Sequence, residues 1–146
     1  MANSLCEVSL TEAPLAASTR SGRSHAGAIV DFWGVVRGLE EGSEIEGIDY
    51  EAHRAMAEYQ LRLIAKEAAG RFALKQIIIH HRVGFVPVGD ASLFLRVTAE
   101  RRAAAFAASE WVVDELKHRV PIWKRPKFKI DNQPGPRSVT ALQLGK

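Results

Sequence analysis

The sequence predicts an α+β domain in which two helices pack on one mixed or antiparallel sheet. Three observations predict this class. First, the chain has 146 residues, 47% of them hydrophobic and 25% charged, as in a folded domain. Second, several short apolar runs have a period of two, which is typical of strands, and third, two longer runs have helical spacing. A chain of this length buries about 68–70% of its unfolded surface, so it can form one core without disulfides. The single cysteine, Cys6, excludes an internal disulfide and a cysteine-rich zinc module.

The first part of the chain predicts a linker and two strands. Residues 1–25 are expected to hold an N-terminal strand and a linker, since residues 11–25 are mostly small and polar. From 26 to 37 the side chains alternate and both faces are largely apolar, which is typical of a central strand covered on both sides. A glycine-containing acidic loop (38–44) and a second strand (45–50) follow.

Two segments carry the helical spacing. The second of them runs over 100–119, with Thr98 as its expected N-cap and a proline beyond its end. The first, over 53–72, is expected to end at Gly70, because glycine commonly terminates helices. Its buried stripe is expected to be Ala57, Leu61, Ile64, Ala65 and Ala68.

Two further strands are expected between the helices. Residues 75–83 contain a β-branched run, and residues 91–98 alternate cleanly, so one face of that second strand is expected to be polar or lightly covered. The main domain is therefore expected to span residues 26–125. The proline-containing remainder, 126–146, is expected to be an irregular tail.

Charge is distributed unevenly along the chain. The net charge is only +3, from 20 basic and 17 acidic residues. The stretch 117–129 nevertheless contains seven basic side chains and no acidic one, whereas six acidic side chains lie within 40–51. This asymmetry predicts an anion-binding region near the C-terminus.

Common catalytic and metal-binding signatures are absent. The sequence has no P-loop, G-x-S-x-G, H-E-x-x-H or paired C-x-x-C. His80 and His81 are adjacent on a predicted strand, where consecutive side chains point to opposite faces, so they are not expected to share an ion. No metal site and no cofactor are predicted.

Two lysines are the candidates for chemistry. Lys117 lies in the last predicted turn of the second helix, and Lys124 follows a proline turn that can direct it back toward the first. A lysine among other cations, and beside the apolar Ile122 and Trp123, has its ammonium form disfavoured, which makes the amine available as a nucleophile or proton shuttle. The alternative is that these cations only complement the helix dipole.

Three arginines are candidates for anion binding. Arg101 and Arg102 begin the second helix, where two cations oppose the helix dipole unless an anion is bound there. Arg37 lies at the end of the first predicted strand. The planar guanidinium matches the geometry of phosphate. The alternative is that Glu100 and solvent satisfy the first two arginines.

Five motifs together suggest a family. The motifs are GAIVDFWGVVR, IDYEAHRAMA, IHHRVGFVPVGD, VTAERRAAAF and DELKHRVPIWKR. With these motifs in the family's order and spacing over about residues 26–125, the chain resembles the large, catalytic subunit of molybdopterin synthase. Each motif alone is weak, but five in register are specific.

The resemblance implies a fold, partners and an activity. The fold would be α+β and hammerhead-like, in a homodimer that forms a heterotetramer with a ubiquitin-like small subunit. The Gly-Gly thiocarboxylate of that subunit would enter a pocket and give up sulfur to cyclic pyranopterin monophosphate, so the chain would be a sulfurtransferase of molybdenum cofactor biosynthesis. By the same resemblance, Lys117 and Lys124 match the two essential lysines, and Arg37 and Arg102 match arginines of the substrate site.

The chain departs from the family pattern at three positions. Arg101 stands where a histidine is usual, and an arginine stays charged and cannot relay protons as imidazole does. It can still bind the phosphate of the substrate. His53 stands where a tyrosine is usual, and Pro126 stands where a glutamate is usual.

These departures leave two alternatives. One is a divergent paralogue that binds the small subunit or a phosphorylated ligand without catalysis. The other is a nucleic-acid-binding module that uses the basic stretch 117–129. No apolar run reaches the length of a membrane span, and the first residues show no secretory pattern, so a cytoplasmic location is expected.

Overall fold

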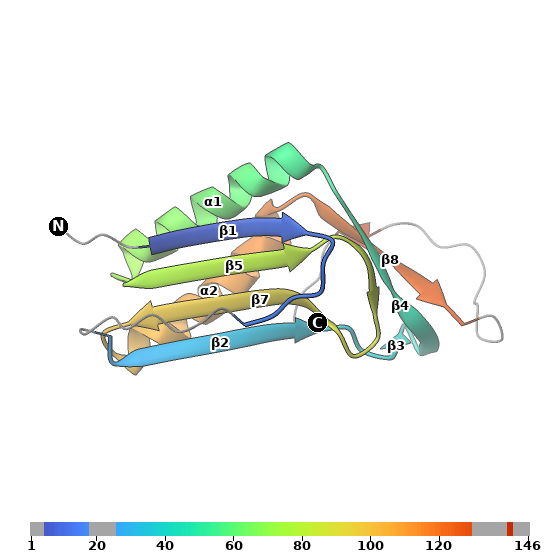
Figure 1. Cartoon of the computed structure of the whole chain (residues 1–146), viewed down its shortest axis with the longest axis horizontal. Coiled ribbons are helices and arrows are strands. Elements are labelled where there is room, and N and C mark those ends of the chain that lie inside the picture. Colours follow the sequence, from blue (N-terminus) through green and yellow to red (C-terminus); the bar gives the residue numbers. More distant parts are fainter. Residues whose placement is uncertain (1–4, 18–25, 130–139, 142–146) are drawn as a thin grey trace.

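The computed structural model describes residues 5–17, 26–129 and 140–141. These residues form a four-stranded sheet, a five-stranded second sheet with fewer strand residues in total, and a layer of two helices (Figure 1). The four-stranded sheet is called the larger sheet below. In chain order the elements are β1 (Leu5–Thr11), β2 (Ala28–Val35), β3 (Leu39–Glu40), β4 (Ser43–Ala52), α1 (Arg54–Arg71), β5 (Gln76–Arg82), β6 (Gly84–Pro87), β7 (Ala91–Ala99), α2 (Arg102–Arg119), β8 (Ile122–Phe128) and β9 (Thr140–Ala141).

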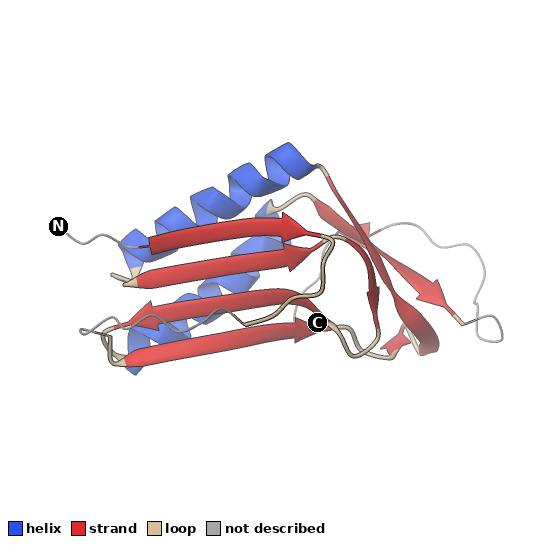
Figure 2. Cartoon of the chain, in the orientation of Figure 1, coloured by secondary structure: helices blue, strands red, loops and turns tan. Residues whose placement is uncertain are grey.

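The larger sheet carries both helices on one face. Its strand order is β1-β5-β7-β2, and it is mixed because β1 runs parallel to β5 while the other neighbours are antiparallel. Figure 2 shows α1 and α2 together behind this sheet. The core between the layers includes the fully buried Leu61, Ile79, Leu95 and Leu116. The predicted α+β class, with two helices on a mixed sheet, is therefore confirmed.

A second sheet extends from one end of the first (Figure 1). Its central strand, β4, pairs with β3, β6 and β8, and β8 also pairs with β9. The predicted strand at 45–50 lies within β4. The predicted acidic loop is a hairpin instead, with β3 as its first strand. Glu41 and Gly42 form its tip at φ values of 51° and 82°, which suit a two-residue hairpin turn.

Helix α1 matches its predicted apolar stripe, but the predicted end of α1 and the predicted start of α2 are wrong. All five residues of the predicted stripe on α1 are buried. Gly70 lies inside α1, which ends at Arg71, and it is Ala73 that adopts the left-handed conformation, at φ 53°. Thr98 is not the N-cap of α2 but a residue of β7, and the capping position is occupied by Arg101. Neither described helix is long and apolar enough to cross a membrane.

Strand β2 lies at the edge of the larger sheet, not at its centre as predicted. Its residues alternate between half-buried and exposed positions, and Trp33 is 38% exposed. Apolar side chains on both faces therefore do not mean burial on both faces. Only the face that points to the helices contributes to the core, for example through Val30 and Phe32.

Strand β7 shows the opposite departure. One of its faces was expected to be lightly covered, yet every residue from Ser92 to Ala99 is buried. The polar side chains on it are satisfied by neighbours. Arg96, only 3% exposed, donates to both carboxylate oxygens of Asp31 on β2 at 2.7 and 2.8 Å and lies over the ring of Phe94. Alternation of residue types cannot reveal such cross-strand pairing.

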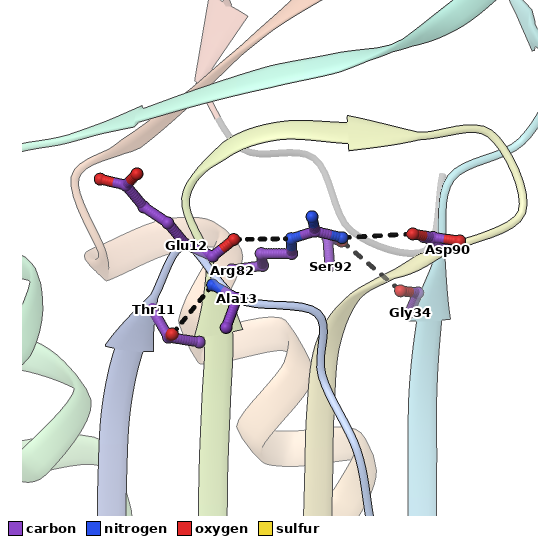
Figure 3. A network of polar contacts seen from close by, with 7 residues as sticks. All are labelled: Thr11, Glu12, Ala13, Gly34, Arg82, Asp90 and Ser92. Carbon is purple, nitrogen blue, oxygen red and sulfur yellow. Dashed lines mark hydrogen bonds and ion pairs between the residues drawn. The ribbon is translucent and has the colours of Figure 1, made fainter.

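The N-terminal segment is fastened to the end of the larger sheet. Figure 3 shows the buried Arg82 reaching the carbonyl oxygen of Glu12 and the carboxylate of Asp90, both at 3.3 Å. The backbone N–H of Ala13 donates to the Thr11 hydroxyl. The described part of the predicted linker is thus anchored. At the other terminus, β8 continues to Phe128 and β9 forms, so those parts of the predicted irregular tail are strand.

Candidate anion-binding site

The basic stretch 117–129 is largely neutralised by the acidic stretch 40–51. Strands β4 and β8 are antiparallel neighbours, so the two stretches lie side by side. The resulting pairs are Lys124–Glu40 (3.5 Å), Arg125–Glu51 (2.9 Å), Lys127–Glu46 (3.5 Å) and Lys129–Glu44 (3.1 Å). The two stretches that gave the charge asymmetry of the sequence therefore cancel most of each other's charge.

Lys117 is the exception within this stretch. It lies half-buried in the last turn of α2. Of the lysines and arginines at 117–129, it alone has no carboxylate within ion-pair distance among the residues that the structure describes. A tight turn then directs the chain into β8, where the N–H of Ile122 donates to the carbonyl oxygen of Val120 at 2.8 Å. Lys117 and Lys124 thus lie on either side of this turn.

Lys124 occupies a largely enclosed position. It is opposite Tyr50 in the β4–β8 register, and its side chain is 14% exposed beside a Glu40 side chain that is 18% exposed. The Glu40 carboxylate is its ion-pair partner, at an N–O distance of 3.5 Å.

Tyr50 connects the lysine to the larger sheet. Its hydroxyl donates to the hydroxyl of Ser92 on β7 at 3.3 Å, and its ring meets the edge of the His81 ring at 5.4 Å. Burial raises the pKa of Tyr50, and the charge of Glu40 raises it further, against the hydrogen bond with Ser92. The phenol therefore remains neutral at physiological pH.

The two adjacent histidines lie in different environments, as predicted for neighbours on a strand. His81 is fully buried, and its Nδ1 atom contacts the carbonyl oxygen of Arg82 at 2.8 Å. Burial lowers its pKa to about 4. His80 is paired with Glu7 at 2.6 Å. Within the described ranges, no three His, Cys, Asp or Glu side chains are grouped to hold a metal ion.

The arginines at the start of α2 border a separate hollow of about 500 Å³. Arg101 caps the helix without a side-chain hydrogen bond, and Arg102 is its first residue. Both are exposed, and the Nε atom of Arg101 is 3.9 Å from a carboxylate oxygen of Glu100. Gly27 forms another part of the wall. A Cβ at this glycine would lie 2.3 Å from the carbonyl oxygen of Glu100, so only glycine allows this approach.

The predicted site residues therefore form two groups in one chain. Arg101 and Lys117 stand at opposite ends of α2, about 24 Å apart along its axis at 1.5 Å per residue. Arg37 is exposed and lies between β2 and β3, on the segment that leads to Glu40. Arg37 thus lies on the connection into the second sheet, which also holds Lys124, whereas the length of α2 separates Arg101 and Arg102 from Lys117.

Glu40 and Tyr50 were not recognised from the sequence. Tyr50 meets Lys124 through the pairing of β4 with β8, and Glu40 reaches it by a side-chain ion pair from β3, so both contacts join segments that are far apart in the chain. The sequence did contain a signal for this pairing. The acidic stretch 40–51 and the basic stretch 117–129 have similar lengths, which favours two antiparallel strands joined by cross-strand ion pairs.

The fold and these clusters define a class of protein: an α+β domain with basic side chains at both ends of one helix. The family model described as MoaE protein matches residues 7–119. The chain belongs to this family.

Individual relatives agree with that assignment. The molybdopterin synthase catalytic subunit of Oryza sativa subsp. indica is 43% identical over 103 residues, which are 70% of this chain and 53% of that protein. The Pyrococcus abyssi protein of the same name is 42% identical over 102 residues, 70% of this chain and 69% of its own. The chain thus spans about half the length of the rice relative. The solved structure of molybdopterin synthase from Staphylococcus aureus has a TM-score of 0.71 and 28% identity, covering 83% of each chain.

Proposed function

We propose that this chain is the catalytic subunit of a molybdopterin synthase. It transfers sulfur from the thiocarboxylated C-terminus of a ubiquitin-like small subunit to cyclic pyranopterin monophosphate and so forms the molybdopterin dithiolene. One observation carries the proposal: in a chain of this family, Lys117 has no carboxylate partner among the described residues, while the other lysines and arginines of 117–129 are paired. We also propose the cytoplasm as its location.

The two lysines have different roles in this proposal. Lys117 lies close to the entering glycine tail and polarises the thiocarboxylate and its acyl carbon. Lys124 engages the pterin substrate or a covalent intermediate. Both reactants are anionic, so the reaction needs fixed positive charge in a site partly shielded from water, where such charge is most effective. The low exposure of Lys124 supports that shielding.

Arg37, Arg101 and Arg102 bind the phosphate and pterin in this proposal. A single pterin cannot span the roughly 24 Å between Arg101 and Lys117 of one chain. In a homodimer, the arginines of one copy can instead complete the lysine cluster of the other, since the same surface patches recur on both subunits. Arg101 is charged at every accessible pH, so it contributes binding and not proton transfer.

A reconstituted assay tests the proposal. The chain is mixed with thiocarboxylated small subunit and precursor, and the two-sulfur product is measured by mass spectrometry. Lys117→Ala and Lys124→Ala are each expected to abolish most product. Lys127→Ala is the matched control, because its ion pair with Glu46 lies on the exposed side of the same strand pair. Near-full turnover by both site variants would refute the assigned roles.

Arg101 favours one alternative, a paralogue without catalysis. Such a protein would dock the small subunit and yield no product in a single turnover, whereas the enzyme yields the two-sulfur pterin. Nucleic-acid binding is less well supported, because five cations of the basic stretch are paired with glutamates. A steep salt dependence of micromolar binding to generic RNA would favour it.

A further inference from the structure

The ion pair between Lys124 and Glu40 differs from the others along β4 and β8. Its side chains are 14% and 18% exposed, whereas the side chains in the pairs made by Arg125, Lys127 and Lys129 are all at least 43% exposed. An ammonium shielded to this degree needs an opposite charge close by, because an unpaired charge away from water is costly. In the chain alone, Glu40 provides that charge.

The contact is nevertheless a loose one. Its N–O distance is 3.5 Å, whereas a well-formed charge-assisted hydrogen bond between nitrogen and a carboxylate is about 2.7–2.9 Å. A ligand anion that reaches the shorter distance would therefore gain energy by replacing the carboxylate.

The position of Glu40 favours such a replacement. It lies in β3, a strand of two residues that pairs only with the start of β4. Two residues of the tip, Glu41 and Gly42, connect the strands. Moving this side chain therefore disturbs little of the sheet, while Tyr50, the neutral neighbour opposite Lys124, remains in place.

We infer that Glu40 is a built-in competitor for the anion-binding position at Lys124, which an incoming anionic group must displace. The consequence is selectivity. A ligand with its own negative charge releases Glu40 and leaves the lysine paired, whereas a neutral analogue of the same shape leaves a shielded ammonium without a partner. The inference rests on the proposed function only for the source of the anion, which is either a C-terminal carboxylate group or a phosphate monoester.

The first test measures the accessibility of the amine and needs no substrate. A short pulse of an amine-acetylating reagent is applied to the full chain, and labelling of Lys124 and Lys127 is read by peptide mass spectrometry. Glu40→Gln is expected to raise the labelling rate of Lys124 about fivefold, as expected for loss of an ion pair worth about 1 kcal/mol, and to leave Lys127 unchanged. Glu46→Gln is the matched control, since it removes an exposed pair of equal length and should leave Lys124 unchanged. An unchanged Lys124 rate in Glu40→Gln would overturn the inference.

The second test measures competition directly. A peptide that ends in a Gly-Gly carboxylate and inorganic phosphate are titrated separately by calorimetry into the wild-type chain, Glu40→Gln and Glu46→Gln. Glu40→Gln is expected to bind one of the two anions about fivefold more tightly, and the anion that gains identifies the source. Equal or weaker binding of both anions would overturn the inference.

A replacement variant and a separate readout keep the labelling and binding results interpretable. If Glu40→Gln fails to fold, as judged by its thermal unfolding, Glu40→Asp is used, because it retains the charge but withdraws the carboxylate by one methylene group and should weaken the competition in the same direction. A failure of the proposed function would appear differently, as wild-type chain that yields no two-sulfur product. Labelling of Lys124 does not depend on that outcome.

Discussion

The separation of the two basic clusters along α2 makes a quantitative prediction about the assembly. One variant carries Lys117→Ala and Lys124→Ala, and a second carries Arg101→Ala and Arg102→Ala. Each is expected to be inactive alone. About 24 Å of helix separates these clusters within one chain, so in the proposed enzyme we expect a working site to combine the lysines of one copy with the arginines of the other.

Mixing the two variants should then restore activity. Random association gives mixed dimers for about half of the molecules, and in each mixed dimer one of the two sites combines intact lysines with intact arginines. The expected recovery is therefore about a quarter of the wild-type activity. If one chain supplied both clusters to the same site, every site in the mixture would lack one cluster and no recovery would occur.

The assay must ensure exchange between copies. The two variants are co-expressed with different affinity tags, mixed dimers are purified through both tags, and product is measured with thiocarboxylated small subunit in excess. Purified mixed dimers should reach about half of the wild-type activity. Activity no greater than that of the separate variants, from dimers shown to be mixed, would refute the composite site.

Three further predictions concern stability. Leu61→Ala removes a side chain that is 0% exposed and should lower the free energy of unfolding, measured in urea, by about 2–5 kcal/mol. Leu39→Ala is the control. Its position is 56% exposed, so it should change that free energy by less than about 0.5 kcal/mol. The pKa of His81 is lowered from 6.5 to about 4, so the unfolded chain binds more protons in this window and stability falls as the pH drops through it. The lowered pKa reduces the free energy of unfolding by about 3 kcal/mol between pH 7 and pH 4. In His81→Phe this free energy should therefore depend less steeply on pH. Identical slopes for the wild-type chain and the variant would contradict this. Asp31→Asn should lower the free energy of unfolding by about 2 kcal/mol, because it weakens the two hydrogen bonds to the buried Arg96. An unchanged urea midpoint would show that these hydrogen bonds do not stabilise the fold.

Features that depend on local periodicity were predictable from the sequence. The apolar stripe of α1 follows from spacing alone, as does the strand around the 77–79 run, and each lies where it was expected. The positions of Lys117 and Lys124 about a turn also follow from a local signal, the proline between them.

Features that depend on distant partners were not predictable in this way. Trp33 reads as a buried residue of a central strand, yet no strand pairs on the outer side of β2 in the described part of the chain. Arg96 reads as a surface residue, yet Asp31 allows it to be buried. The same limit applies to Lys124, whose ion-pair partner Glu40 is more than eighty positions away in the sequence.

The larger sheet joins segments that are remote along the chain. Strand β1 pairs with β5, and β2 with β7, through residues about 70 positions apart. Closing such long loops loses conformational entropy before any native contact stabilises the chain. The order in which this protein acquires its native structure is therefore constrained. The β3–β4 hairpin, the two helices and the β5–β7 pair can form early from nearby residues, whereas β1 and β2 must wait for encounters with segments far along the chain. We therefore expect slow refolding, with the N-terminal strand among the last elements to gain protection from hydrogen exchange.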